Sequence, residues 1–460
     1  MEHSLHFIGI GGIGMSAIAK VLLHEGFSIS GSDVAESHLT QELSANGADI
    51  RYGHRAENIP LHTEAVVYSS AVKADNVEMV EARRRGLKVY KRAEMLAYLL
   101  SVKDGIGVAG AHGKTTTSAM IATMLEAAGC DPTVIIGGML STIGGNAKAG
   151  EGPNLVAEAD ESDGTFLLLL PKIAVVTNIE ADHLDYYHDL DSIVEAFGQY
   201  LRQVPEDGFA VICNDCAILR ELAQEIPGRY IRYGLHNSSD YEAKNLCHKN
   251  GGVCGDVYYH GEKLGRLQLH VAGEHNISNA LAAIAVGREL GLTFAQCAMG
   301  LSQFRGTGRR YELLAAVPGF QVVDDYAHHP TEIAATIQAA RSQGIKKMMV
   351  VFQPHRYSRT QEMYREFAAA LFDADRILLC ELYPAFEQPI PGVSAKLVVE
   401  ELRRLGHLYV EYAETMDDAY AFLLRELMDE ELLLVMGAGN VRSLSERVAK
   451  HVLAQGIKEK

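Results

Sequence analysis

The chain has 460 residues, of which 48% are hydrophobic and 22% are charged, a composition typical of a globular protein with about three domains. Its 42 basic and 59 acidic residues give a net charge of −17, without the basic stripe that a general nucleic-acid-binding protein uses. No run of about 18 apolar residues is present, which excludes a membrane-spanning helix, and the N-terminus has no secretory signal, so we expect a cytoplasmic protein.

The first hundred residues alternate strands and helices, which predicts a parallel sheet. We expect strands at 5–8, 27–31, 65–69 and 88–90 and helices at 15–25 and 76–86. Gly9-Ile-Gly-Gly-Ile-Gly14 lies between the first strand and helix, and Asp33 ends the next strand. This spacing is a dinucleotide fingerprint, in which a helix N-terminus holds a diphosphate and the acid binds a ribose hydroxyl. Another nucleotide diphosphate, or a tight turn without a ligand, would fit the same pattern.

A second unit opens with a strand at 106–109 and runs to about Gly308, with its least regular stretch at 236–265. The strand leads into Gly107-Val-Ala-Gly-Ala-His-Gly-Lys-Thr-Thr-Thr117, which resembles a phosphate loop. Backbone N–H groups and Lys114 would hold a triphosphate, and the hydroxyl of Thr115 suits Mg²⁺. The motif departs from the strict pattern, because Val108 occupies the first glycine position. An ATP site is the strongest single inference from the residues.

Two acid-rich segments follow strands of this unit, Glu158-Ala-Asp-Glu-Ser-Asp163 and Glu180-Ala-Asp-His-Leu-Asp185. Parallel strands end at the same edge of a sheet, where the phosphate loop also lies. Acids and a histidine at this edge could hold Mg²⁺ and the γ-phosphate. A solvated acidic turn explains Asp163 and Asp185 better than it explains Glu158 or His183.

The remaining features of this unit are less specific. His275 and Asn279 stand four residues apart before an apolar helix at 280–291, so they could bind one ligand. Simple helix capping fits equally well.

The seven cysteines of the chain are scattered and odd in number, which favours reduced thiols. Cys213 and Cys216 have a metal-like spacing, but ordinary buried or loop cysteines are the better interpretation.

The last third predicts a doubly wound α/β domain. We expect strands at 321–323, 347–352, 376–380, 408–412 and 432–436, and helices near 331–343, 358–372, 394–405, 415–429 and 441–454. Two polar segments, Asp324-Asp-Tyr-Ala-His-His-Pro330 and Gln353-Pro-His-Arg-Tyr-Ser-Arg359, lie at strand ends, where such domains bind ligands. Helix capping is the alternative, but two such segments at adjacent strand ends favour a site.

In this order and spacing, these motifs together resemble the Mur ligases, ATP-dependent amide-forming enzymes of peptidoglycan synthesis, over essentially the whole chain. The resemblance implies three α/β domains. These are an N-terminal Rossmann-like UDP-binding domain at 1–104, a central P-loop ATPase-like domain at 105–309 and a C-terminal doubly wound Rossmann-like domain at 310–460. The N-terminal glycine-rich fold would then bind the UDP of a nucleotide sugar rather than a dinucleotide.

The resemblance also implies site residues. Those expected at the UDP-sugar are Gly11, Gly12, Gly14, Ser32, Asp33, Ser69 and Ser70. Those expected at ATP are Gly110, Ala111, His112, Gly113, Lys114, Thr115, Thr116, His275, Asn279 and Arg309, with Lys114 stabilising the migrating phosphoryl group and Arg309 linking the central and C-terminal domains. The metal ligands would be Thr115, Glu158 and His183, and the amino-acid site would contain Tyr326, His355, Arg356 and Arg359.

The nearest likeness is to the family member that joins L-alanine to the carboxylate of UDP-N-acetylmuramate through an acyl phosphate, releasing ADP and phosphate. It implies Mg²⁺, with two ions expected and Mn²⁺ as an alternative, and a monomer or weak homodimer. One rival is the sibling that attaches recycled murein tripeptide, which we expect to differ around 69–72 and 353–360. A second, an NAD-dependent oxidoreductase, leaves the phosphate loop unused. A third, a nucleotide-binding regulatory protein without catalysis, leaves the acidic and histidine-bearing strand ends unexplained.

Overall fold

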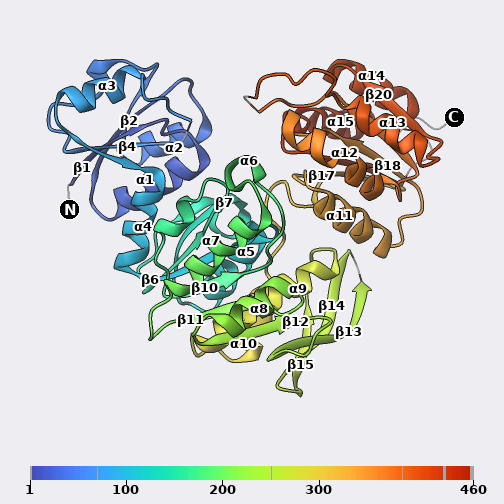
Figure 1. Ribbon diagram of the computed structural model, residues 1–460, viewed down its shortest axis with the longest axis horizontal. Helices are drawn as coiled ribbons and strands as arrows, with labels where there is room; N and C mark the ends of the chain where they lie inside the picture. The colour runs from blue at the N-terminus through green and yellow to red at the C-terminus, as the bar shows by residue number, and fades with distance from the viewer. Residues whose placement is uncertain (1–2, 70, 250, 386, 428–430, 456–460) are drawn as a thin grey trace. The chain divides into compact units, whose positions relative to one another are not determined.

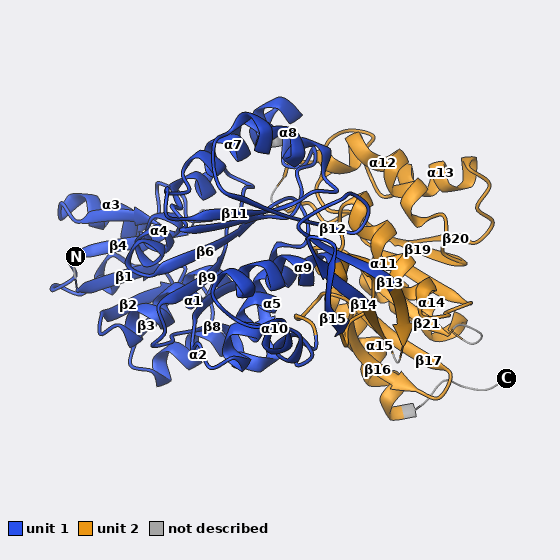
Figure 2. Ribbon diagram, turned by 90° about the horizontal axis from the view of Figure 1, so that it is seen from below, with its two compact units in different colours: residues 1–245, 255–268, 278–305 blue, residues 246–254, 269–277, 306–460 orange. Residues whose placement is uncertain are grey.

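The chain folds around three separate β-sheets in a computed structural model that describes residues 3–69, 71–249, 251–385, 387–427 and 431–455 (Figure 1). The three sheets, each covered by helices, confirm the predicted α/β architecture of three domains. The domain boundaries at 104/105 and 309/310 stay predictions. By internal contacts the chain divides into two compact units (Figure 2). Unit 1 comprises 1–245, 255–268 and 278–305, and unit 2 comprises 246–254, 269–277 and 306–460.

The N-terminal sheet has five parallel strands in the order β3-β2-β1-β4-β5. Its strands are β1 (Ser4–Ile8), β2 (Ser28–Asp33), β3 (Asp49–Tyr52), β4 (Ala65–Tyr68) and β5 (Lys88–Lys91), and its helices are α1 (Ile13–His24), α2 (His38–Ala45), α3 (Val77–Arg84) and α4 (Arg92–Val102), with a 3₁₀ turn, η1 (Ala56–Asn58). The central strand β1 is buried on both faces, as its nearly continuous apolar run predicts. The order reverses beside β1, so the glycine-rich turn after it lies at the switch point of the sheet.

The central sheet has ten strands in the order β15-β14-β13-β12-β11-β10-β6-β9-β7-β8. Its first strands are β6 (Asp104–Ala109), β7 (Thr133–Leu140), β8 (Gly145–Lys148), β9 (Asn154–Glu158), β10 (Ile173–Val176), β11 (Phe209–Cys213) and β12 (Tyr230–Gly234). The helices are α5 (Lys114–Ala127), α6 (Leu184–Tyr187), α7 (Leu190–Arg202), α8 (Ala217–Glu225), α9 (Glu274–Glu289) and α10 (Phe294–Leu301). Because β6 runs parallel to both β9 and β10, the three segments that follow these strands emerge at one edge.

The stretch 236–265, expected to be the least regular, instead forms three long strands, so this expectation was wrong. They are β13 (Tyr241–Lys249), β14 (Gly252–Tyr259) and β15 (Glu262–Gln268). Glycines and charged residues weaken their apolar alternation, and the stronger signal is the turn at His260-Gly261, where both φ angles are positive, as in a two-residue hairpin turn.

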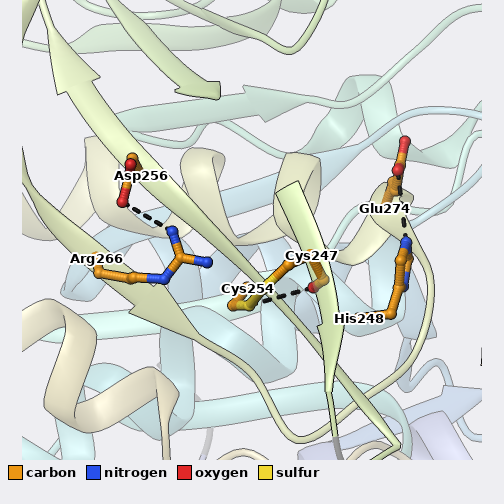
Figure 3. The surroundings of a disulfide bond; sticks show 6 residues. All are labelled: Cys247, His248, Cys254, Asp256, Arg266 and Glu274. Carbon is orange, nitrogen blue, oxygen red and sulfur yellow. Dashed lines mark hydrogen bonds and ion pairs between the residues drawn. A yellow bond between two sulfur atoms is a disulfide. The ribbon is translucent and has the colours of Figure 1, made fainter. Parts of the chain in front are cut away.

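A disulfide joins Cys247 of β13 to Cys254 of β14, with the Cα atoms 5.1 Å apart (Figure 3). The expectation that all seven cysteines are reduced was therefore wrong for this pair. Two neighbouring strands place these side chains within bonding distance, which their spacing along the chain did not reveal. Cys213 and Cys216 are free thiols.

The C-terminal sheet has six strands in the order β16-β17-β21-β18-β19-β20. The strands are β16 (Glu312–Val317), β17 (Phe320–Asp325), β18 (Met348–Phe352), β19 (Arg376–Cys380), β20 (Val410–Ala413) and β21 (Leu432–Met436), and the helices are α11 (Pro330–Ser342), α12 (Tyr357–Leu371), α13 (Lys396–Arg404), α14 (Met416–Glu426) and α15 (Arg442–Gln455). Two apolar cores, one with residues of α11–α13 and the other with residues of α14 and α15, include alternate residues of the strands, as in a doubly wound domain.

Two details of this sheet differ from the prediction. The edge strand β16, which was not predicted, pairs antiparallel with β17. In addition, β21 lies between β17 and β18, so the two polar segments do not follow adjacent strands. Among the helices of the described ranges, none has the length and apolar content needed to cross a membrane.

Candidate active site

The predicted phosphate loop connects β6 to α5 at the carboxyl edge of the central sheet (Figure 1). Gly110 and Gly113 have φ values of +130° and +83°, which residues with side chains rarely adopt. A Cβ at Gly110 would collide with Thr177, and one at Gly113 would lie 2.8 Å from Oδ1 of Asn279. Val108, which replaces the first glycine of the strict motif, is a fully buried residue of β6. The departure from the motif therefore falls in the strand and leaves the loop unaltered.

The segment after β10 braces this loop. The backbone N–H of Ala111 donates to the carbonyl of Asn178 at 3.1 Å, and the N–H of His112 donates to Oδ1 of Asn178 at 2.8 Å. Thr177 Oγ1 donates to the carbonyl of His112 at 2.6 Å. These bonds fix the curve of the loop, which is the preorganisation that a phosphate-binding loop needs.

Lys114 lies in the first turn of α5 and is held by its own loop and by an acid. Its Nζ donates to the carbonyls of Gly110 at 2.6 Å and Ala111 at 3.2 Å, and to Oε1 of Glu161 at 2.8 Å. Burial alone would lower the pKa of Lys114, but nearby carboxylates, Glu161 foremost, raise it well above the usual value. Burial raises the pKa of Glu161 to about 7, against the charge of Lys114. Lys114 therefore stays charged, as a ligand for phosphate must.

The predicted metal ligands Thr115 and Glu158 are in direct contact. Thr115 Oγ1 lies 3.0 Å from both carboxylate oxygens of Glu158, and Oε2 of Glu158 also accepts the N–H of Gly137 at 3.0 Å. A hydroxyl and a carboxylate are oxygen ligands of the kind that Mg²⁺ prefers, so this pair fits the ion. His183 immediately precedes α6 with φ of +54° and is close enough to Asp160 for their charges to interact. Its contact with the same ion stays a prediction.

Helix α9 begins at Glu274, six residues before the predicted start, so it contains both His275 and Asn279. Asn279 Oδ1 accepts the hydroxyl of Thr117 at 3.2 Å and lies beside Gly113 of the phosphate loop. The ring of His275 folds back over Gly273. The structure thus brings Asn279 to the predicted ATP site, while a role of His275 there stays a prediction.

The N-terminal glycine-rich turn is closed by Asp33. The N–H of Gly11 donates to Oδ2 of Asp33 at 2.8 Å, and a Cβ at Gly9 would lie 3.2 Å from the hydroxyl of Ser69. Gly12 caps α1 without a side chain. The turn therefore presents backbone at a helix N-terminus, as an anion site requires. Ser70 lies outside the described residues.

Ser32, another residue predicted at the UDP-sugar, stabilises this turn through hydrogen bonds. Its carbonyl accepts the N–H groups of Gly9 and Ile10, and its buried hydroxyl donates to Oε2 of Glu78 at 2.5 Å. Glu78 also accepts from the side chain of Asn58 at 2.6 Å. Because its hydroxyl is already engaged, Ser32 is better placed to hold the turn than to contact a ligand.

In unit 2, Tyr326, His355 and Arg309 gather where β17, β18 and β21 end. The guanidinium of Arg309 lies 4.5 Å from the centroid of the Tyr326 ring, and its Nη2 donates to the carbonyl of Gly437 at 2.8 Å. His328 links the two predicted aromatic residues, with ring centroids 5.3 Å from Tyr326 and 5.9 Å from His355. Although β21 separates the strands, the segments after them meet. The predicted role of Arg309 as a link between domains beside ATP stays a prediction.

Arg356 and Arg359 both lie close to His355. Burial, followed by the charges of Arg359 and Arg356, lowers the pKa of His355 to about 4, so the ring is neutral at pH 7. Arg356, however, precedes α12 with φ of +69°, in a region that non-glycine residues rarely adopt. Arg356 therefore lies before the helix that contains Arg359, although the charges of both act on the ring of His355. Such local strain is typical of functional positions.

Comparisons with known proteins cover the same three regions. The chain matches the models "Mur ligase family, catalytic domain" at 4–103, "Mur ligase middle domain" at 108–287 and "Mur ligase, glutamate ligase domain" at 309–439. It is 47% identical over 453 residues to UDP-N-acetylmuramate–L-alanine ligase of Desulforamulus reducens, with 98% of each chain covered. The chain belongs to the Mur ligase family. The corresponding protein of Syntrophotalea carbinolica is 47% identical over 447 residues, with 97% of each chain covered.

Solved structures of Mur ligases have the same fold as this chain. UDP-N-acetylmuramate-alanine ligase of Thermotoga maritima has a TM-score of 0.83 at 31% identity, over 98% of this chain and 99% of that one. A murein peptide ligase of Psychrobacter arcticus has a TM-score of 0.72 at 23% identity, over 99% of each chain, and shows a shared fold. The oxidoreductase and non-catalytic interpretations are thereby set aside.

Several residues of this Mur ligase site escaped the sequence-based selection. Glu161 belongs to a recognised motif but was not assigned to the site, and Asn178 lies shortly after the end of β10. Tyr383, which follows β19, stacks on His355 with centroids 5.6 Å apart, and Arg92 of α4 lies beside Gly14. A polar residue shortly after a parallel strand is a signal that would have found Asn178 and Tyr383, whereas Arg92 depends on packing between helices.

Proposed function

We propose that this Mur ligase joins L-alanine to the carboxylate of UDP-N-acetylmuramate, using ATP and releasing ADP and phosphate. The observation that carries the proposal is the arrangement at one edge of the central sheet, where Lys114 and Thr115 begin the helix after β6 and Glu158 ends the adjacent parallel strand β9. Full-length relatives at 47% identity bear the name of that activity, and they favour L-alanine over tripeptide as the acceptor.

The chemistry requires activation of a poor electrophile. A muramoyl carboxylate oxygen attacks the γ-phosphorus of ATP, ADP leaves, and an acyl phosphate forms. The amine of L-alanine then attacks the acyl carbon, and phosphate departs with the former carboxylate oxygen as the amide forms. Lys114 would stabilise charge on the transferring phosphoryl group, and the phosphate loop would position it.

Mg²⁺ is the metal that the oxygen donors of this edge suit, with Mn²⁺ as the alternative. Thr115 and Glu158 would hold it, and His183 would complete the set of protein ligands. Bound there, the ion would neutralise phosphate charge during transfer. Two ions remain the expectation.

The nucleotide sugar would bind the N-terminal glycine-rich turn. Gly11, Gly12 and Gly14 would approach the diphosphate, with Asp33 and Ser69 beside it. The guanidinium of Arg92, next to Gly14, adds a cation at the same helix N-terminus. Ser32 would act by holding the turn.

The amino acid would bind in unit 2. A free amino acid carries its carboxylate close to its amine, and arginine offers planar, bidentate geometry for a carboxylate. Arg356 and Arg359 beside His355 would supply this clamp, with Tyr326 on the other side. A small site would favour L-alanine over glycine by about 1–3 kcal/mol, the value of one methyl group.

Phosphate release with UDP-N-acetylmuramate, ATP and one acceptor at a time tests the proposal. The panel is L-alanine, glycine, L-serine, D-alanine and the recycled tripeptide, with omission of each substrate as the control. L-alanine should give the highest kcat/KM, and an Arg356→Ala/Arg359→Ala variant should raise the KM for L-alanine. Preference for the tripeptide, or an unchanged KM in that variant, would refute it. A cytoplasmic location and a monomer or weak homodimer stay predictions.

A further inference from the structure

Glu161 is a buried carboxylate beside the phosphate loop to which no role has been assigned above. It is 3% exposed, and its Oε2 has no hydrogen-bond partner in the described part of the chain. A buried anion with an unsatisfied oxygen is costly, so a carboxylate kept in this state calls for a functional explanation.

Two hydrogen bonds hold the backbone of Glu161 in place. The carbonyl of Glu161 accepts the hydroxyl of Tyr187 at 2.6 Å and the N–H of Gly164 at 3.0 Å. Tyr187 ends α6, the short helix that follows His183. The segment after β9 is thus tied to the segment after β10, so the backbone of Glu161 is held beside the loop while its side chain stays free to rotate.

The partner of Glu161 is the lysine of the phosphate loop. A lysine ammonium has three donors, and those of Lys114 are used by Glu161 and by the carbonyls of Gly110 and Ala111. A nucleotide phosphate that binds Lys114 must therefore replace one of these acceptors. Of the three, only the carboxylate of Glu161 is an anion on a rotatable side chain.

We propose that Glu161 is a positioning residue that occupies the phosphate position on Lys114 when no nucleotide is bound, and that the nucleotide displaces it. The inference rests on the proposed ATP-dependent function. It predicts that Glu161→Gln, which keeps the shape and removes the charge, tightens nucleotide binding. Breaking a charge-assisted hydrogen bond is part of the cost of binding, so the Kd for ADP should fall roughly tenfold at pH 8, where Glu161 is ionised. Rapid return of Glu161 to Lys114 would also speed ADP release.

Calorimetric titration of ADP into the full-length protein tests this, with Asp163→Asn as the matched control. Asp163 lies in the same segment but bonds Thr165 rather than Lys114, so its variant should match the wild type. In a Lys114→Met background, the tightening caused by Glu161→Gln should vanish. A merely structural role would give the same effect in both backgrounds. Should Glu161→Gln fail to fold, Glu161→Asp, which is one methylene shorter, should tighten binding in the same direction.

The outcomes separate this inference from the proposed function. If the wild type binds neither ADP nor ATP, the proposed function fails, and this inference fails with it. If the wild type binds ADP and Glu161→Gln binds equally or more weakly, only the role of Glu161 is overturned. The role of Glu161 is also overturned if Glu161→Gln tightens ADP binding equally in the Lys114→Met background.

Discussion

Thr115 donates its hydroxyl into the fork of the Glu158 carboxylate, 3.0 Å from each oxygen. This contact joins the first turn of α5 to the end of β9 and places two oxygen ligands side by side. Glu158→Gln should preserve the contact while removing the negative charge that a divalent cation needs. We expect the Mg²⁺ concentration for half-maximal phosphate release to rise by roughly 10-fold to 100-fold or more. That is the range by which metal affinity falls when a metal site loses a supporting group. Magnesium titration of the two proteins measures it, and an unchanged requirement would exclude Glu158 as a ligand.

Lys114→Ala should fold normally, because this side chain serves a charged ligand and not an apolar core. Acyl-phosphate formation should fall by roughly 10³-fold or more, the scale of a lost phosphoryl clamp. Lys148→Ala is the control, since Lys148 pairs with Glu126 and Asp131 away from the loop. Near-normal turnover by folded Lys114→Ala would remove this lysine from the mechanism.

Glu78 makes the stability of the N-terminal sheet depend on pH. Burial alone would raise its pKa, but hydrogen bonds from His6, Ser32 and Asn58 lower the pKa from 4.5 to about 2. A lowered folded-state pKa gives stability that is complete above pH 4.5 and is lost as the pH falls toward 2. The shift corresponds to roughly 3 kcal/mol.

Thermal unfolding between pH 6 and pH 3 checks this linkage. Glu78→Gln should lower the Tm at pH 6 and flatten its decline toward pH 3. Glu81→Gln, in which a pair with the exposed Arg84 is lost, serves as the control and should follow the wild type. Parallel curves for Glu78→Gln and the wild type would show that Glu78 is not the titrating group.

The Cys247–Cys254 disulfide predicts a thiol count. Protein purified and denatured without reductant should expose five thiols, the free cysteines of the structure, and reduction should raise the number to seven. Peptide mass spectrometry after alkylation should assign the two additional thiols to the β13–β14 hairpin. Seven reactive thiols before reduction would mean that the original expectation of reduced cysteines was correct.

Local signals were sufficient for much of the fold and for the phosphate loop. The strands β1, β6, β10 and β19 are short apolar runs bounded by turn residues, and the glycine at 113 stands where the backbone must be left-handed. Strand ends were visible too, because a polar residue after an apolar run marks the edge of a parallel sheet. These features depend on neighbours in the sequence.

The remaining features depend on pairs that lie far apart in the sequence. The edge strand β16 pairs only with β17, and its run of apolar residues does not alternate as a half-buried strand should, while the place of β21 between β17 and β18 has no local signal. Nothing in the sequence around Ser32 indicates that its hydroxyl donates to Glu78. Likewise, the pairing of Lys114 with Glu161 joins residues 47 positions apart, and several acids near the loop could have taken that place.

The fate of one oxygen atom tests the proposed acyl-phosphate ligation most directly. UDP-N-acetylmuramate labelled with ¹⁸O in its carboxylate is incubated with the enzyme, ATP and L-alanine, and the products are examined by mass spectrometry. We expect one ¹⁸O in the released phosphate and the other in the amide of UDP-N-acetylmuramoyl-L-alanine, formed together with one ADP. Release of unlabelled phosphate, or of phosphate without the amide product, would contradict the account.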